Sequence, residues 1–61
     1  MMKGSTVRKV QRRLAKRGFA VGSVDGVYRS QTAAAVCSFQ DGVGLTPDGE
    51  VGPDTMAALG L

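Results

Sequence analysis

Residues 25–36 read DGVYRSQTAAAV and residues 48–59 read DGEVGPDTMAAL, so one pattern occurs twice, with a period of 23 residues from Asp25 to Asp48. Each copy begins with Asp-Gly, a dipeptide typical of tight turns, and continues through a Thr into an Ala-rich segment that favours helix. We therefore expect each copy to form a turn followed by a helix. A functional site is expected where the two copies meet.

The segment before the repeat has the pattern of an amphipathic helix. Val7, Val10 and Leu14 recur at the spacing of one helical face. Ser5 or Thr6 is expected to cap the start of this helix, because a hydroxyl oxygen can accept from the free backbone N–H groups there. The cationic residues of the segment fall on the opposite face and predict a solvated surface, with a dedicated binding face as the alternative.

The bounds of the helices follow from capping residues. We expect the first helix to stop at Gly18, the second to run from Arg29 or Ser30 to Gln40, and the third to begin at Pro53. Strands on either side of the first Asp-Gly would be only a few residues long, which is too short for a stable sheet. The sequence thus predicts an all-α fold: a small three-helix bundle with two Asp-Gly turn loops and no substantial sheet.

Side chains at the loops and in the second helix carry further expectations. Thr46-Pro47-Asp48-Gly49 predicts a type I turn, with Pro at its second position. Gln11 and Gln40 lie at apolar-side positions, and we expect their amides to hold loop backbone groups. Cys37, alone in the sequence, is expected to be a small buried side chain. Phe19 is expected to fold back over the first helix.

Size and composition exclude most enzymes. A 61-residue chain has room for one small core, worth about 3–5 kcal/mol. The chain has no His and pairs no nucleophile with a base, so triad and His-based metal chemistry lack a participant. We predict no catalytic residue, metal site or cofactor. No apolar run approaches the length of a membrane span, and no signal peptide is recognised, so the export route is open.

Charge is divided sharply along the chain. Seven of the eight cations precede Gly18, so this segment has a formal charge of +7. All five acids and the remaining cation, Arg29, follow Gly18, so the rest of the chain has a formal charge of −4. This asymmetry favours an anionic partner for the first segment, such as a nucleic acid or a polyanionic cell-wall polymer, although solubility alone would also explain it.

Four motifs in order resemble the type 1 peptidoglycan-binding domain family. They are VxxVQxxLxxxGF at 7–19, DGxY at 25–28, TxxAVxxFQ at 32–40 and GLxxDGxVGxxTxxxL at 44–59. The resemblance covers nearly the whole chain and divides it into an N-terminal tail, 1–3, and a domain, 4–61. It implies a compact three-helix domain that is usually appended to wall-lytic amidases, glycosidases, transglycosylases or peptidases, including phage endolysins, and that holds them on murein.

Two positions depart from the family pattern. Arg29 stands where relatives usually have Gly, and it would cost about 1 kcal/mol or more if the backbone there needed positive φ. Otherwise its guanidinium lies beside the Asp-Gly loop as a candidate ligand donor. Met56 stands where many relatives carry Trp, so an aromatic platform for a sugar is missing.

Ligand binding is predicted at the repeated loops. Peptidoglycan offers amides, hydroxyls, N-acetyl groups and carboxylates, so its site needs a few fixed donors and acceptors. The candidate residues are Asp25, Gly26, Tyr28, Arg29, Gln31, Asp48 and Gly49. Each has a competing structural role, since Asp can cap a turn, Gly can permit a backbone angle and Tyr can fill the core.

The predicted function is a noncatalytic peptidoglycan-binding module that targets a muralytic enzyme or a phage component to murein, in the cell wall or periplasm or on a phage. Its partners are expected to be peptidoglycan and a catalytic hydrolase domain or subunit, with no membrane partner. Two alternatives stay open. One is a small basic nucleic-acid-binding protein, which the absence of a helix-turn-helix pattern disfavours. The other is a structural or assembly subunit that kept the fold without glycan binding.

Overall fold

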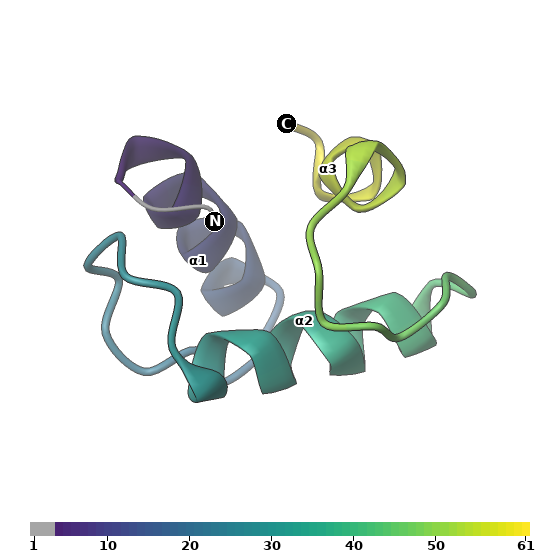
Figure 1. The fold of residues 1–61 in the computed structure, drawn as a ribbon, viewed down its shortest axis with the longest axis horizontal. Coiled ribbons are helices and arrows are strands. Elements are labelled where there is room, and N and C mark those ends of the chain that lie inside the picture. The colour runs from purple at the N-terminus through teal and green to yellow at the C-terminus, as the bar shows by residue number, and fades with distance from the viewer. Residues whose placement is uncertain (1–3) are drawn as a thin grey trace.

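Three α-helices form the regular structure of residues 4–61, the part of the chain that the computed structural model describes (Figure 1). Helix α1 spans Ser5–Lys16, α2 spans Ser30–Gly42 and α3 spans Pro53–Leu59. No strand occurs among these residues, so the predicted all-α bundle is confirmed. The predicted tail, residues 1–3, lies outside the described residues.

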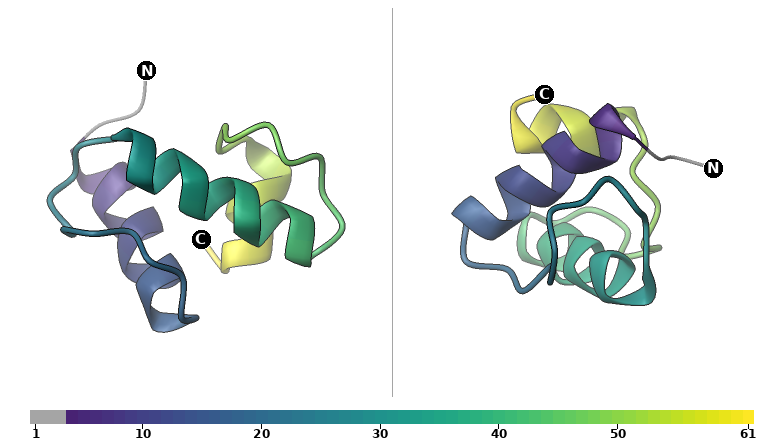
Figure 2. Two further views of the ribbon diagram at one scale, coloured as in Figure 1. Left: turned by 90° about the horizontal axis from the view of Figure 1, so that it is seen from below. Right: turned by 90° about the vertical axis from the view of Figure 1, so that its left-hand side faces the viewer.

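Helices α1 and α3 both lie on one side of α2 (Figure 1). Two long connections join the helices, and they run along opposite ends of α2 (Figure 2). The core fills the space between the helices, and its buried apolar side chains are Val10, Leu14, Val21, Ala35, Val36, Phe39 and Leu59. Because every helix contributes to this one cluster, removing any helix would expose the apolar face of another.

The start of α1 differs from the expectation. Gly4, with φ of 80°, is the N-cap, and neither Ser5 nor Thr6 caps the helix through its side chain. The Gly4 N–H instead donates to Gly26 O at 2.9 Å, so the first turn of α1 is anchored to the first Asp-Gly loop. A tertiary backbone contact has replaced the local side-chain cap, and the prediction of a hydroxyl cap was wrong.

The end of α1 follows the prediction. Gly18 adopts φ of 90°, the left-handed conformation that glycine tolerates best. The Phe19 N–H then donates to Leu14 O at 3.0 Å, which turns the chain back over the helix. The Phe19 ring packs edge-on against Phe39, with centroids 5.8 Å apart, a favourable aromatic geometry. Phe19 therefore covers the core as expected.

Helix α2 continues past its expected end. It includes Asp41 and Gly42 and ends at the C-cap Val43, whose N–H donates to Phe39 O and Gln40 O. Cys37 on this helix is half-buried rather than buried, with Sγ 3.6 Å from Pro47 O. Within residues 4–61 no helix combines the length and apolar character needed to cross a bilayer.

Candidate functional site

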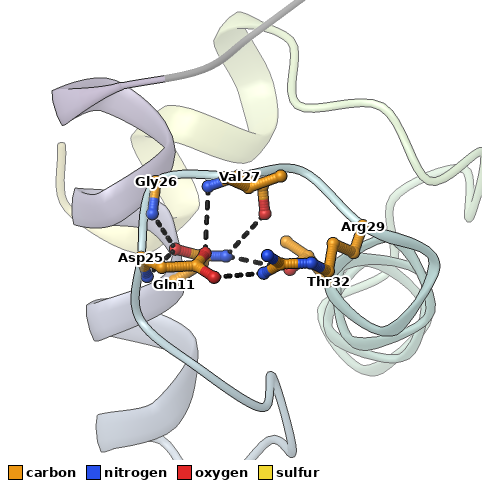
Figure 3. Close-up of polar contacts among 6 residues, drawn as sticks. All are labelled: Gln11, Asp25, Gly26, Val27, Arg29 and Thr32. Atoms are coloured by element: carbon orange, nitrogen blue, oxygen red, sulfur yellow. Dashed lines mark hydrogen bonds and ion pairs between the residues drawn. The ribbon is translucent and has the colours of Figure 1, made fainter.

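The first Asp-Gly loop is held by one buried amide. Gln11 Oε1 accepts from the N–H groups of Asp25 and Gly26, at 3.1 and 2.9 Å. Its Nε2 donates to Val27 O and to Thr32 Oγ1, both at 3.0 Å (Figure 3). The Gln11 side chain is fully buried and uses both ends of its amide. Helix α1, the loop and the first turn of α2 are therefore joined at a single residue.

The second loop is held in the same way by Gln40. Its Oε1 accepts from Gly49 N–H at 3.0 Å, and its Nε2 donates to Glu50 O at 2.8 Å and to Thr55 Oγ1 at 3.0 Å. Nε2 also lies 3.1 Å from Asp48 Oδ1. This amide joins α2, the second loop and the first turn of α3, and the prediction that both glutamines hold loop backbone is confirmed.

The repeat thus consists of a glutamine, an Asp-Gly loop and a threonine. Thr32 and Thr55 each follow the Asp of their copy by seven residues, counted from 25 to 32 and from 48 to 55. The glutamines are 29 residues apart, from 11 to 40, whereas the loops repeat after 23. Sequence reasoning missed the role of the two threonines, although their equal position in both copies was the available signal.

Both aspartates close Asx turns at the loop. Asp25 Oδ1 accepts from Val27 N–H at 3.0 Å, and Asp48 Oδ1 accepts from Glu50 N–H at 2.9 Å. The hydrogen bonds that Asp48 accepts, first from Glu50 N–H and then from Gln40, lower the pKa of its carboxyl group. The structural role expected as the alternative for both aspartates is therefore present.

The type I turn predicted for residues 46–49 does not form. Asp48 N–H donates to Thr46 O, only two residues back, at 2.9 Å. A type I turn would direct the Gly49 N–H to Thr46 O, but this group donates to Gln40 instead. The buried Gly49 N–H bonds to the Gln40 amide in place of Thr46 O. Either bond would satisfy this N–H, but only the bond to Gln40 also joins the loop to α2.

Gly26 and Gly49 are buried and serve the backbone. Their φ angles are 79° and 74°. A Cβ atom at Gly26 would lie 2.8 Å from Gly4 O, and one at Gly49 would lie 3.2 Å from Cys37 Sγ. Because their N–H groups also donate to the two glutamines, these glycines set the loop geometry and offer a ligand no free donor.

Tyr28 links the two loops. Its hydroxyl donates to Gly49 O, so the side chain two positions after the first Asp-Gly reaches the second Asp-Gly. The side chain is half-buried and packs against the core, and this burial raises the pKa of the phenol above its usual value of 10.0. The two copies of the repeat contact each other through this hydrogen bond, as expected.

Arg29 is unstrained and paired. Its φ is −101°, and the equivalent Gly52 has φ of −96°, so neither residue needs the left-handed region and Arg replaces Gly here without backbone cost. The guanidinium forms an ion pair with Asp25 (Figure 3). The hydrogen bond from Arg29, followed by the one from Val27 N–H, lowers the pKa of the Asp25 carboxyl.

The remaining predicted site residues face solvent. Gln31 is exposed on the first turn of α2, and Asp48 is exposed on the second loop. A groove runs beside that loop, and Asp48 lines it together with Glu50, Asp54 and the start of α3. Asp25, Tyr28, Arg29 and Gln31 do not line this groove. The structure therefore divides the predicted set between the two loops. The Asp25–Arg29 pair and Gln31 lie at the first loop, Asp48 lies at the second, and Tyr28 lies between them.

Residues 3–59 match the model of a family described as "Putative peptidoglycan binding domain". The chain belongs to this family. The match covers both Asp-Gly loops and all three helices, so the whole described fold is the family's binding domain. The resemblance inferred from the four motifs is thereby confirmed, and the chain corresponds to a noncatalytic module.

Curated relatives carry this domain as a small part of a longer protein. The chain is 43% identical over 95% of its length to a protein named "Probable N-acetylmuramoyl-L-alanine amidase" from Bacillus licheniformis. It is 43% identical over 92% of its length to the N-acetylmuramoyl-L-alanine amidase CwlM of Mycobacterium tuberculosis, and 42% identical over 97% to the amidase CwlL of B. licheniformis. It spans only 17%, 14% and 18% of these proteins. No solved structure shows a significant match.

Proposed function

We propose that this chain binds peptidoglycan and holds a cell-wall hydrolase at its substrate. The observation that carries the proposal is the family match over residues 3–59, which accounts for all three helices and both loops. Its relatives are named as amidases, and more than four fifths of their length lies outside the match. That remainder has room for a catalytic domain. A tether of this kind raises the local concentration of substrate at the enzyme without any chemistry of its own.

The ligand contacts are proposed at the exposed polar groups of the two loops. Arg29 can donate to a stem-peptide carboxylate, and Asp25 and Asp48 can accept from amide or hydroxyl groups of the polymer. Gln31 supplies a neutral amide that both donates and accepts. Gly26, Gly49 and the buried part of Tyr28 support this surface from beneath, through the contacts described above. Residues 4–61 are proposed as the binding domain.

Sedimentation with purified insoluble peptidoglycan tests the proposal. The chain is expected to pellet with murein at moderate salt, and Arg29→Gln is expected to weaken this binding because it removes the charge that faces a carboxylate. Arg17→Gln is the matched control, since it removes one exposed charge at the C-terminal end of α1, whereas the contact of α1 with the first Asp-Gly loop through Gly4 lies at the other end of the helix. Equal losses from both variants would mean that binding depends on net charge alone.

The nucleic-acid alternative is tested in the same assay. Duplex DNA immobilised on beads replaces murein, at the same salt concentrations. Retention on DNA with none on murein would overturn the proposed function and favour the alternative. Retention on murein supports it whether the hydrolase is bacterial or encoded by a phage, and places the chain at the cell wall.

A further inference from the structure

A second groove lies between α1 and the C-terminal end of α3, away from the first Asp-Gly loop. Helix α1 contributes four cations to this basic groove, at positions 9, 12, 13 and 16. These positions follow the i, i+3, i+4, i+7 spacing of one helical face and span about 10.5 Å at 1.5 Å per residue. The complete lining is Thr6, Lys9, Arg12, Arg13, Lys16, Met56, Gly60 and Leu61.

No Asp or Glu side chain lines the basic groove. The ion pair between Asp25 and Arg29 is the one found among residues 4–61, and it lies on the first loop. Lys9, Arg12 and Lys16 have no hydrogen-bond or ion-pair partner within the described chain and are exposed. Repulsion among like charges on one helix face is unfavourable in the free protein, and a bound anion relieves it. The groove is therefore selective for negative charge.

The shape of the basic groove is set by Arg13. Its Nη1 donates to Leu59 O at 3.2 Å and so connects the two walls, α1 and the end of α3. Figure 1 shows the C-terminal segment turning from α3 toward α1. Half-buried Met56 and Leu61, which is 37% exposed, add apolar surface to the lining. The site thus combines a row of cations with an apolar floor, and both are in place before any ligand binds.

Nucleic acid fits this groove poorly. A helix that reads duplex DNA must protrude into the major groove, but the cationic face of α1 is flanked by the end of α3. Single-stranded nucleic acids are bound by stacking their bases on aromatic side chains, and the lining has no aromatic residue. A flexible anionic chain without bases satisfies both constraints.

The anion also needs a charge at regular, short intervals. Carboxylates of stem peptides sit on separate branches of the murein, whereas a polymer of polyol units joined by phosphodiesters carries one charge in every repeat and stays ionised at physiological pH. The short carbon chain of each polyol unit suits the apolar floor at Met56 and Leu61. This chemistry matches a row of cations on one helix face.

We propose that the basic groove binds a linear polyol-phosphate polymer of the bacterial cell wall, as a second contact beside the murein site. The proposal rests on the proposed function only in placing the chain at the wall. The two sites use different surfaces of the domain, since the groove is lined by α1 and α3 and the murein contacts lie on the Asp-Gly loops. Two weak contacts to one wall add avidity.

Sedimentation with two wall preparations tests the proposal. Intact walls keep their polyol-phosphate polymer, and walls extracted with hydrofluoric acid lose it through cleavage of phosphodiesters while the murein remains. The parent chain is expected to bind intact walls more tightly than extracted walls. Arg12→Gln/Lys16→Gln is expected to bind intact walls about tenfold more weakly, equivalent to ~1.4 kcal/mol, and extracted walls as the parent does.

The matched control removes two charges from the same helix outside the groove. Arg8→Gln/Arg17→Gln has the same net charge as the groove variant, and neither residue lines the groove. Arg17 lies over the Phe39 ring, so circular dichroism is used to verify that the control is folded. The control is expected to keep the preference for intact walls, and equal losses in both variants would overturn the proposal.

Titration with purified poly(glycerol phosphate) separates this proposal from the murein site. Each cation that contacts a phosphate adds about 0.7 to the slope of log affinity against log salt concentration, the value for single-stranded phosphodiester chains. The groove variant is therefore expected to have a slope shallower by about 1.4. If the parent chain does not bind this polymer, the basic groove is refuted as its site. Extracted walls report on the murein contacts alone, so their result does not change this conclusion.

Discussion

Replacement of Gln40 by Met should remove most of the stability of the domain. The Gln40 side chain is only 2% exposed and takes part in four hydrogen bonds. Met has a similar length and volume but no amide, so the apolar packing is largely kept. The buried Gly49 N–H and the Thr55 hydroxyl would lose their partner, whereas Glu50 is exposed and its carbonyl can bind water.

The magnitude follows from these two orphaned groups. Each buried polar group without a partner costs about 1–3 kcal/mol, so the variant should lose roughly 2–6 kcal/mol. A domain of 61 residues has a total stability of about 3–9 kcal/mol, at 0.05–0.15 kcal/mol per residue. At the middle of both ranges the expected loss is about 4 of about 6 kcal/mol, or roughly two thirds of the folding free energy, and a domain at the low end of stability would unfold.

Urea unfolding followed by far-ultraviolet circular dichroism measures this loss. Gln31→Met is the matched control, because Gln31 is an exposed glutamine on the same helix with no side-chain hydrogen bond among the described residues, and its replacement should change stability by less than about 0.5 kcal/mol. A Gln40→Met variant as stable as this control would refute the reasoning, since it would show that the amide contributes nothing beyond its volume.

Three further predictions concern the loops. Tyr28→Phe removes the hydrogen bond to Gly49 O and should cost about 0.5–1.5 kcal/mol of stability at neutral pH. Because burial raises the pKa of the folded phenol, the parent should also lose stability above about pH 10. A Phe variant with the same alkaline stability profile would argue against this cause. Gly26→Ala combines positive φ with a clash against backbone and should lower the melting temperature by an amount corresponding to more than about 1 kcal/mol; an unchanged melting temperature would mean that the loop can move away. Asp25 and Asp48 have lowered pKa values in the folded chain, so their contribution to folding stability is present above about pH 3.9 and is lost as the pH falls through the folded values. Thermal melts at acid pH should show this loss of stability, and Asp25→Asn should make it smaller. An identical acid profile in the variant would exclude the pair of Asp25 with Arg29 as a source of the loss.

The helices were largely predictable because their signals are local. The spacing of Val7, Val10 and Leu14 predicts a face that the structure buries completely. Gly18 ends the first helix and Pro53 starts the third as their conformational preferences require. Each of these outcomes depends on a few neighbouring residues, and no distant contact opposes it.

Two of the failed predictions lie where a distant group competes with a local one. The cap at Ser5 and the type I turn at residues 46–49 are both sound local expectations, but Gly4 pairs with the first loop and Gly49 N–H pairs with Gln40. The end of α2 was missed for a local reason, because backbone bonds from Val43 N–H and Leu45 N–H to Gln40 O close the helix two residues beyond its expected end at Gln40.

The sequence predicted the candidate ligand residues as a set of loop residues but not their arrangement, and their contact with a ligand stays a prediction. The repeat located Asp25 and Asp48, and both are at the surface or near it. The burial of both loop glycines, the pairing of Arg29 with Asp25 and the contact of Tyr28 with the other copy depend on the path of two loops of unequal length. Spacing along the chain carries no record of that path.

By itself, the sequence determined the helices, the two Asp-Gly loops, the uneven charge and the family, because each depends on residue identity and short-range order. The sequence also predicted that Gln11 and Gln40 hold loop backbone, but only the tertiary structure decided which loop each of them holds and that the basic face of α1 meets the end of α3. The physical reason is that a buried amide or a groove needs groups from several segments at hydrogen-bonding or contact distance. Only the folded chain brings those segments together.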